Sequence, residues 1–424
     1  MVDDHEAARL EKPQLFPDER KEARPMIRRI GKTAVIVLAV LCLSGCWSRR
    51  ELNELSIAVA LGLDAAPNQK VLVSVQIVNP AAIGQKKAGP EGSPVYVFRS
   101  EASSVYEALR EMTTVMNRKV YLSHLRLVVF GEELAKRGIS DQVDFLSRYH
   151  ELRTDFFLIV AKQARAQDVL SVLTPEESIP ANELYSSLDV AEQNWAVTSK
   201  MTLDKVIDDL TTPGISPALT GLKIEGPVKA GAGLGNIRTT ESPTLLIYDG
   251  IAVFRQDRLI GWLNTRESKG YHYISDKVKR TVIEDECPNG RFEVELIRSK
   301  TKLVGKVRNG NPEIGIQVHA EGNVADLSCH EKMMKPGTVQ DIERLTEENI
   351  KEKIKEAINA AQSRYHADIF GFGEAIRRAD PKRWHKLKPD WDARFSKIDV
   401  QINVDVKIRR IGTITDSIQS RIRK

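Results

Sequence analysis

Apolar and polar residues alternate in short, changing periods along most of the chain, which predicts strands and helices in mixed order. Ser56–Asp64 and Val71–Asn79 are apolar runs separated by a short polar turn, and this pattern predicts a β-hairpin. Apolar residues recur at helical spacing over Ser103–Asn117, with Ser103 or Ser104 as the expected N-cap. The first part of the chain therefore combines sheet and helix.

The second half is richer in strands and ends on a helix and one more strand. Leu245–Phe254 and Arg258–Leu263 predict another hairpin. A long amphipathic helix is expected to begin with Thr338 as its cap. From Ile398 to Ile408, six apolar residues alternate with polar ones, so we expect a strand with one buried and one wet face. Three further strands are predicted at Val278–Glu284, Phe292–Val304 and Ile314–Val324.

The order of these elements predicts an α+β fold of about three domains, built from mixed or antiparallel sheets with flanking helices. A Gly- and Ala-rich stretch offers the clearest internal boundary. The expected divisions are residues 1–25 as an extension, 26–45 as a leader, 46–225 as an N-terminal α+β domain, 226–241 as a linker, 242–325 as a β-rich middle domain and 326–424 as a C-terminal α+β domain.

Composition limits the class of protein. The 424 residues include 63 Lys and Arg against 58 Asp and Glu, a net charge of +5 that is too dilute to indicate nucleic-acid binding. Hydrophobic residues make up 42% and charged residues 29%, as in folded chains. The mean hydropathy of −0.31 excludes a polytopic membrane protein. Four cysteines are too few for a disulfide scaffold of this length.

One short segment changes the expected compartment. Ala34–Leu43 is an unbroken apolar run, too short to span a bilayer but suited to the apolar centre of a secretory signal. Arg28, Arg29 and Lys32 precede it, and Leu-Ser-Gly leads directly to Cys46, as in a bacterial lipobox. The spacing predicts cleavage before Cys46 and a diacylglyceryl group on its thiol. Two acyl chains hold a protein firmly on a membrane, whereas one chain holds it marginally.

Two points about this segment stay open. The alternative to a leader is a buried N-terminal helix in which Cys46 is an inert core residue. The polar stretch of residues 1–25 is unusual before a signal, and Met26 followed by Ile-Arg-Arg would be an ordinary start. We expect that translation begins at Met26 and that residues 1–25 are a gene-start error or a disordered extension.

The remaining candidate chemistry is sparse. Gly231–Gly235 does not fit a dinucleotide-binding pattern and reads as a flexible linker. Cys287 and Cys329, taken with His319 and His330, match no common zinc spacing, but a disulfide between the two cysteines is possible on an exported chain. We expect Tyr271–Tyr273 to serve packing. No catalytic constellation, metal or other cofactor is predicted.

Four stretches resemble one known family in its own order. Cys46-Trp-Ser-Arg-Arg-Glu-Leu-Asn-Glu-Leu55 resembles the mature start of the Ger(x)C lipoproteins, the C subunits of bacterial spore germinant receptors, with Ser48 in place of the usual Asp. Similar blocks follow at Tyr121–Ala135, at Gly250–Phe254 with Leu259–Leu263, and at Asp368–Gly373 with Trp384, Trp391 and the last strand.

The resemblance implies a non-catalytic, lipid-anchored receptor subunit with no nucleic-acid partner. Its partners would be the integral membrane subunits A and B, and its location the outer face of the spore inner membrane. Arg49 and Arg50, beside the lipid on Cys46, either contact anionic headgroups or merely begin the folded body.

Two other classes compete with this interpretation. A solute-binding lipoprotein of a transport system would need two α/β lobes with repeated βαβ units, which the β-rich middle region does not show. A lipid-anchored hydrolase would need a nucleophile, a base and a group to orient them, and no such set is visible.

Overall fold

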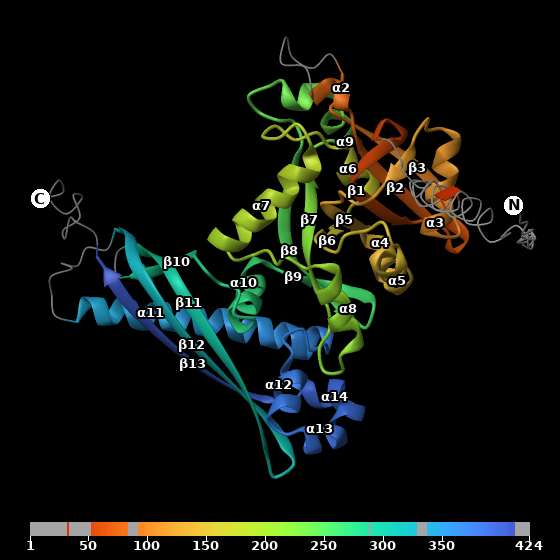
Figure 1. The fold of residues 1–424 in the computed structure, drawn as a ribbon. Coiled ribbons are helices and arrows are strands. Elements are labelled where there is room, and N and C mark those ends of the chain that lie inside the picture. The colour runs from red at the N-terminus through yellow and green to blue at the C-terminus, as the bar shows by residue number, and fades with distance from the viewer. Residues whose placement is uncertain (1–31, 34–51, 84–91, 288–289, 329–336, 412–424) are drawn as a thin grey trace, which may run out of the picture. The chain divides into compact units, whose positions relative to one another are not determined.

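A computed structural model describes residues 32–33, 52–83, 92–287, 290–328 and 337–411 (Figure 1). The chain divides into two compact units, Met1–Glu54 and Leu55–Lys424. The described part of the first unit is residues 32–33 and the 3₁₀ turn η1 (Leu52–Glu54). The expected cleavage region before Cys46 lies outside the described residues. The second unit contains both sheets and the three hydrophobic clusters described below, so it has the contacts needed to fold without the segment before it.

A nine-stranded mixed sheet forms the larger part of the second unit. Its order is β3-β2-β1-β5-β6-β7-β8-β9, with β4 paired to β1. The central strands β1, β5, β6 and β7 are parallel, whereas the outer pairs are antiparallel. The strands are β1 (Leu55–Ala65), β2 (Val71–Val78), β3 (Val95–Ala102), β4 (Lys119–Tyr121), β5 (Leu127–Gly131), β6 (Phe157–Ala161), β7 (Ala218–Glu225), β8 (Leu245–Arg255) and β9 (Arg258–Leu263).

Both faces of this sheet are covered, which explains why the central strands β5 and β6 are buried at every position. In β5, Val128 and Phe130 join one hydrophobic cluster, while Leu127 and Val129 join another on the opposite face. The helices of this part are α2 (Pro80–Ile83), α3 (Val105–Glu111), α4 (Glu132–Arg137), α5 (Ser140–Arg148), α6 (Ala166–Ser171), α7 (Pro180–Asn194), α8 (Leu203–Thr211) and α9 (Val228–Gly231), with the 3₁₀ turns η2 (Pro67–Gln69), η3 (Met112–Thr114) and η4 (Leu234–Ile237).

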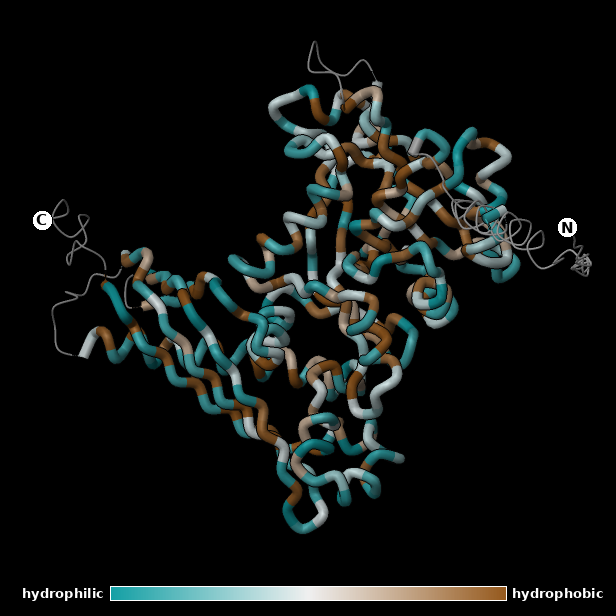
Figure 2. Tube along the Cα trace, in the orientation of Figure 1, coloured by the Kyte–Doolittle hydropathy of each residue, from teal (hydrophilic) through white to brown (hydrophobic). Residues whose placement is uncertain are grey.

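A second sheet of four long strands has the order β10-β11-β12-β13. Its strands are antiparallel except for the parallel pair β12–β13. Apolar and polar residues alternate along them (Figure 2), and the apolar side packs on α11 in a third hydrophobic cluster. The elements are β10 (Thr281–Cys287), β11 (Gly290–Arg308), β12 (Asn311–Leu327) and β13 (Asp399–Arg410), with the helices α10 (Thr265–Ile274), α11 (Thr338–Asn359), α12 (Phe372–Ala379), α13 (Pro381–Leu387) and α14 (Trp391–Phe395), the π turn η5 (Ala360–Tyr365) and the 3₁₀ turn η6 (Lys388–Asp390).

The predicted fold class and both predicted hairpins are confirmed. One detail of the prediction was wrong. Thr338 is the first helical residue of α11 and its cap is Gly337, in a left-handed conformation. The alternating last strand is confirmed: in β13, Gln401 and Asn403 are exposed, whereas its apolar residues pack against the cluster on the inner face, with Val406 fully buried.

Strand pairing continues across residues 226–241, the expected linker. β7 before this segment and β8 after it pair with each other, and the expected middle range 242–325 contributes strands to both sheets. The segment itself holds α9 and η4, and Asn236 is completely buried. Its side chain binds Leu173 O, Thr244 O and Thr244 N, which fixes the segment to the large sheet.

Candidate functional site

Most of the site residues that were predicted from the sequence lie outside the described part of the chain. Cys46, Arg49, Arg50 and Cys329 are among them. Cys287 ends β10 and takes part in a disulfide whose partner also lies outside the described residues. Pairing between Cys287 and Cys329 stays a prediction, and the place of Ser328 supports it, because Ser328 N donates to Arg291 O at 2.9 Å beside the start of β11.

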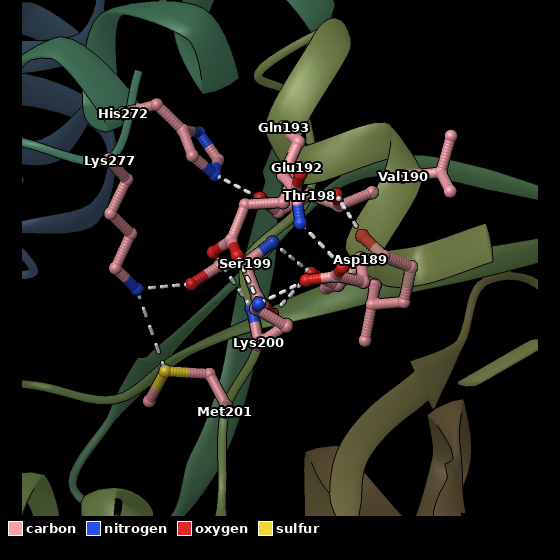
Figure 3. A network of polar contacts seen from close by, with 12 residues as sticks. Asp189, Val190, Glu192, Gln193, Thr198, Ser199, Lys200, Met201, His272 and Lys277 are labelled. Carbon is pink, nitrogen blue, oxygen red and sulfur yellow. Dashed lines mark hydrogen bonds and ion pairs between the residues drawn. The ribbon is translucent and has the colours of Figure 1, made fainter. Parts of the chain in front are cut away.

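A buried polar network joins α10 to the segment between α7 and α8 (Figure 3). His272 is fully buried, with Nδ1 2.6 Å from Ser268 O and Nε2 2.5 Å from Thr198 O. Lys277 reaches Ser199 Oγ, and Ser199 N donates to Thr220 Oγ1 at 2.7 Å. The network therefore connects a helix that packs on α11 with β7 of the large sheet.

Electrostatics favour a neutral His272. Burial lowers the pKa of His272 to about 4, because an imidazolium would lose its hydration there; the carbonyl contacts oppose this shift and the positive charge of Lys277 adds to it. A neutral ring donates through only one nitrogen, so one of the two carbonyls faces a ring nitrogen without a proton. This is a structural contact sensitive to protonation.

The surface side of the same network is an ion-pair cluster on α7. Lys200 contacts the carboxylate of Asp189 and lies 3.2 Å from Glu192 (Figure 3). Gln193 Nε2 donates to Asp189 Oδ2 at 2.5 Å. The hydrogen bond from Lys200 lowers the pKa of Asp189. These charges are paired with one another, so they stabilise the α7–α8 connection.

The most densely bonded side chain in the described part of the chain is Asp368, in the fourth family block. Its Oδ1 accepts from the backbone N–H groups of Phe370, Gly371 and Phe372 at 2.9 to 3.1 Å, and its Oδ2 accepts from Gly373 N at 2.8 Å. Trp391 Nε1 donates to Oδ2 at 3.0 Å. These N–H groups belong to the entry turn of α12, so the carboxylate caps that helix from inside the core.

The same block clamps a segment that precedes β7. Asp368 O accepts from Ser216 N at 2.7 Å. A Cβ on Gly373 would overlap the backbone of Gly214, and Trp384 closes the contact from the side. Gly371 has φ of 74°, which favours glycine. The two glycines, the aspartate and the tryptophans are therefore explained by packing of α12–α14 against the segment before β7.

The two middle family blocks are also structural. Leu127–Gly131 is the central strand β5, and all of its residues are buried. Gly250–Phe254 and Leu259–Leu263 lie in the hairpin β8–β9. Gly250 has φ of 74°, and a Cβ there would overlap Leu263 O, so the pairing of the hairpin requires glycine.

The described residues do not assemble a recognisable catalytic centre. No group of three or more His, Cys, Asp or Glu in them is placed to hold a metal ion. A cavity of about 610 Å³ near α3 and α5 is lined by Lys70, Arg137 and Arg258 with Asp141, and its lining contains neither His nor Cys. Among the helices described, none is both long and apolar enough to cross a membrane.

Comparisons with known proteins agree with the order of these blocks. Residues 48–224 match the family described as spore germination protein N-terminal domain, and residues 249–412 match the family described as spore germination B3/GerAC like, C-terminal. Spore germination protein KC of Bacillus subtilis (strain 168) is 30% identical over 91% of this chain and 97% of its own length. Spore germination protein B3 of the same organism is 24% identical over 92% of this chain and all of its own length.

The fold has a solved counterpart. The crystal structure of the GerBC protein matches with a TM-score of 0.53 at 19% identity, covering 82% of this chain and 96% of that one. The class is thus an α+β spore germination protein. The chain belongs to the GerAC-like, or Ger(x)C, family, as the resemblance implied, and its role is that of a germinant-receptor subunit in spore germination.

Sequence reasoning missed what Asp368 and His272 do. The block Asp-Ile-Phe-Gly-Phe-Gly carries a readable signal, because an aspartate followed by glycines at a helix start is typical of a capping turn. No local signal identifies His272, since its partners Ser268 O and Thr198 O come from different segments.

Proposed function

We propose that this chain is a non-enzymatic C subunit, anchored by a diacylglyceryl group on Cys46 to the outer face of the spore inner membrane. Its partners are the integral membrane subunits A and B of the same receptor. The match to spore germination protein KC over nine-tenths of the chain carries the proposal. The apolar run before Cys46 and the small residues beside it support the anchor.

The anchor is tested in a spore-forming host that lacks related receptor genes. Cys46→Ala is compared with Ser44→Ala, which keeps a small residue before an intact cysteine. We expect mass spectrometry to find a diacylglyceryl N-terminus in the control and none in Cys46→Ala, and we expect Cys46→Ala to leave the membrane fraction. Retention of Cys46→Ala in washed membranes at the level of the control would contradict the anchor.

The receptor role is tested separately. Nutrient-triggered germination, followed as the fall in optical density of a spore suspension, should be lost when the gene is deleted and restored by the intact gene. The A and B subunits should co-purify with a tagged chain from detergent-solubilised spore membranes. Normal germination of the deletion strain, or a tagged chain that brings down neither subunit, would refute the role.

The solute-binding alternative predicts a different result. Calorimetric titration of residues 47–424 with amino acids and sugars should show no tight binding if the chain is a non-binding subunit. Tight binding of one such solute would favour the alternative.

A further inference from the structure

The four-stranded sheet has one face that no described element covers. On its inner face, α11 packs on β13 and α12 packs on β11, and alternate residues of β12 such as Ile314, Ile316 and Val318 belong to the same hydrophobic cluster. The intervening residues of β12 and β13, including Gln317 and Asn403, point to the other side and are exposed.

A row of cations follows β11 on this outer face. Five of six alternate outer positions, spanning about 33 Å at strand spacing, are basic and exposed, and the sixth is Val304. We call the five the basic stripe: Arg298, Lys300, Lys302, Lys306 and Arg308.

The stripe is only partly neutralised. Lys300 pairs with Asp276, and Arg308 lies 3.4 Å from Glu313. Within the described residues, Lys302 and Lys306 have no ion-pair partner. Nearer the other end of β11, the outer positions are acidic, with Glu293 and Glu295. Along β11 the charge is therefore polarised, with the positive half toward the turn that joins β11 to β12, where Glu313 and Asp399 are the acidic neighbours on β12 and β13.

A hollow lies in the positive half. Its volume is about 180 Å³, and Lys306 and Arg308 stand on one side of it with Gln401 and Asn403 on the other. Gly315 is part of its lining, and a Cβ there would meet nothing closer than 3.9 Å. Two cations and two amides around the hollow can donate to a phosphate oxygen, and Glu313, which also lines it, lies 3.4 Å from Arg308.

We propose that the basic stripe is a docking surface for an anionic phospholipid membrane. The outer face carries no Phe, Tyr or Trp among its described residues, so it lacks the aromatic anchors that dominate protein–protein interfaces. Flexible, exposed cations fit a diffuse anionic surface, which attracts each of them without precise geometry. The preference for a lipid surface over an acidic protein rests on the proposed membrane attachment. The basic stripe would add a second, electrostatic contact with the membrane.

The test uses residues 47–424, which lack Cys46, so lipidation cannot contribute. Sedimentation with vesicles of phosphatidylcholine and phosphatidylglycerol in equal parts measures partitioning, and pure phosphatidylcholine vesicles are the reference. The stripe variant replaces three cations, and the control variant makes the same charge change at exposed cations elsewhere. The stripe variant is Lys302→Gln, Lys306→Gln and Arg308→Gln, and the control is Arg118→Gln, Lys229→Gln and Lys355→Gln.

We expect the parent and the control to bind the anionic vesicles. The stripe variant should partition on the order of 100-fold more weakly, since each lost cation changes the partition by about fivefold. Raising the salt from about 0.05 M to about 0.5 M should release the parent, because screening shortens the reach of exposed charges. Circular dichroism and thermal melting must show that both variants are folded like the parent.

Three results would overturn the proposal. They are no binding of the parent to anionic vesicles, equal losses in stripe and control variants, and equal binding to neutral vesicles. Retention of the parent on immobilised poly-glutamate without vesicle binding would assign the stripe to an acidic protein instead. None of these results bears on Cys46, whose lipidation is read by mass spectrometry of the full chain.

Discussion

Replacing Asp368 with Ala should be among the most damaging single changes available in this chain. The substitution removes the acceptor for four backbone N–H groups and for Trp391 Nε1–H, while the site stays buried. A buried donor left without a partner costs about 1–3 kcal/mol. Because some of the five donors can shift toward other acceptors or admit water, we expect a total loss of about 4 kcal/mol in the free energy of unfolding.

Asp368→Asn tests the contributions of the two carboxylate oxygens separately. The amide can keep an oxygen for the three donors at Oδ1, but its NH₂ would face Gly373 N and Trp391 Nε1. We expect a loss of about 2 kcal/mol, between that of Ala and that of the parent. Burial raises the pKa of Asp368 to about 6, so the measurement belongs at pH 8, where the carboxylate is ionised.

Asp380→Ala is the matched control, since Asp380 also caps a helix and lies only 12 positions further on. Its Oδ1 accepts one bond, from Arg383 N at 3.0 Å, in an exposed setting. The control should lose about 1 kcal/mol. Urea unfolding of residues 47–424, followed by tryptophan fluorescence and by circular dichroism, gives all three values. If Asp368→Ala were no more destabilised than Asp380→Ala, the buried cap at Asp368 would not be a major source of stability.

Three further changes test other parts of the fold. The pKa of His272 is about 4 in the folded chain and near 6.5 in the unfolded chain, so the unfolded chain takes up the proton first as the pH falls. The free energy of unfolding should therefore fall by up to about 3 kcal/mol between pH 6.5 and pH 4. A His272→Gln variant that keeps the same pH slope would refute this. Gly270→Ala should cost about 3 kcal/mol because its Cβ would overlap the backbone of α11, whereas Gly235→Ala, with nothing within 4 Å, should cost less than about 0.5 kcal/mol; equal melting temperatures would contradict the packing. Peptide mapping without reduction should join Cys287 to Cys329, and reduction should cost about 3 kcal/mol; recovery of both cysteines as free thiols would exclude the bond.

Local patterns were enough for most elements. The run Val71–Asn79 and the hairpin Leu245–Leu263 are strongly apolar and bounded by turn residues, so their strand character does not depend on distant contacts. The helix over Ser103–Asn117 was placed correctly at its start, where Ser104 caps Glu107 N at 3.1 Å. The α-helix ends earlier than predicted, because the 3₁₀ turn η3 replaces it from Met112 onward. This change follows from packing, which the spacing of apolar residues alone does not reveal.

The order of strands could not be read locally. β1 lies between β2 and β5, and β7 lies between β6 and β8, so neighbours in the sheet come from segments up to about 60 residues apart. Composition marked 226–241 as a flexible linker, yet Asn236 is buried there and makes three hydrogen bonds. A glycine-rich stretch indicates that the backbone can adopt many conformations. Tertiary contacts determine whether such a stretch stays flexible or packs tightly.

The family blocks are of two kinds: those whose residues are required by packing, and those whose residues are not. Only the second kind points to function. The glycines and tryptophans of the fourth block are required by close packing around Asp368, and Gly250 of the third is required by its hairpin, so these residues specify a fold. The stretch from Cys46 to Glu54 precedes the folded unit and combines a predicted acylation site with two arginines. Function should therefore be sought at residues that the fold does not explain: the N-terminal stretch and the basic outer face of the small sheet, where Lys302 and Lys306 have no ion-pair partner among the described residues.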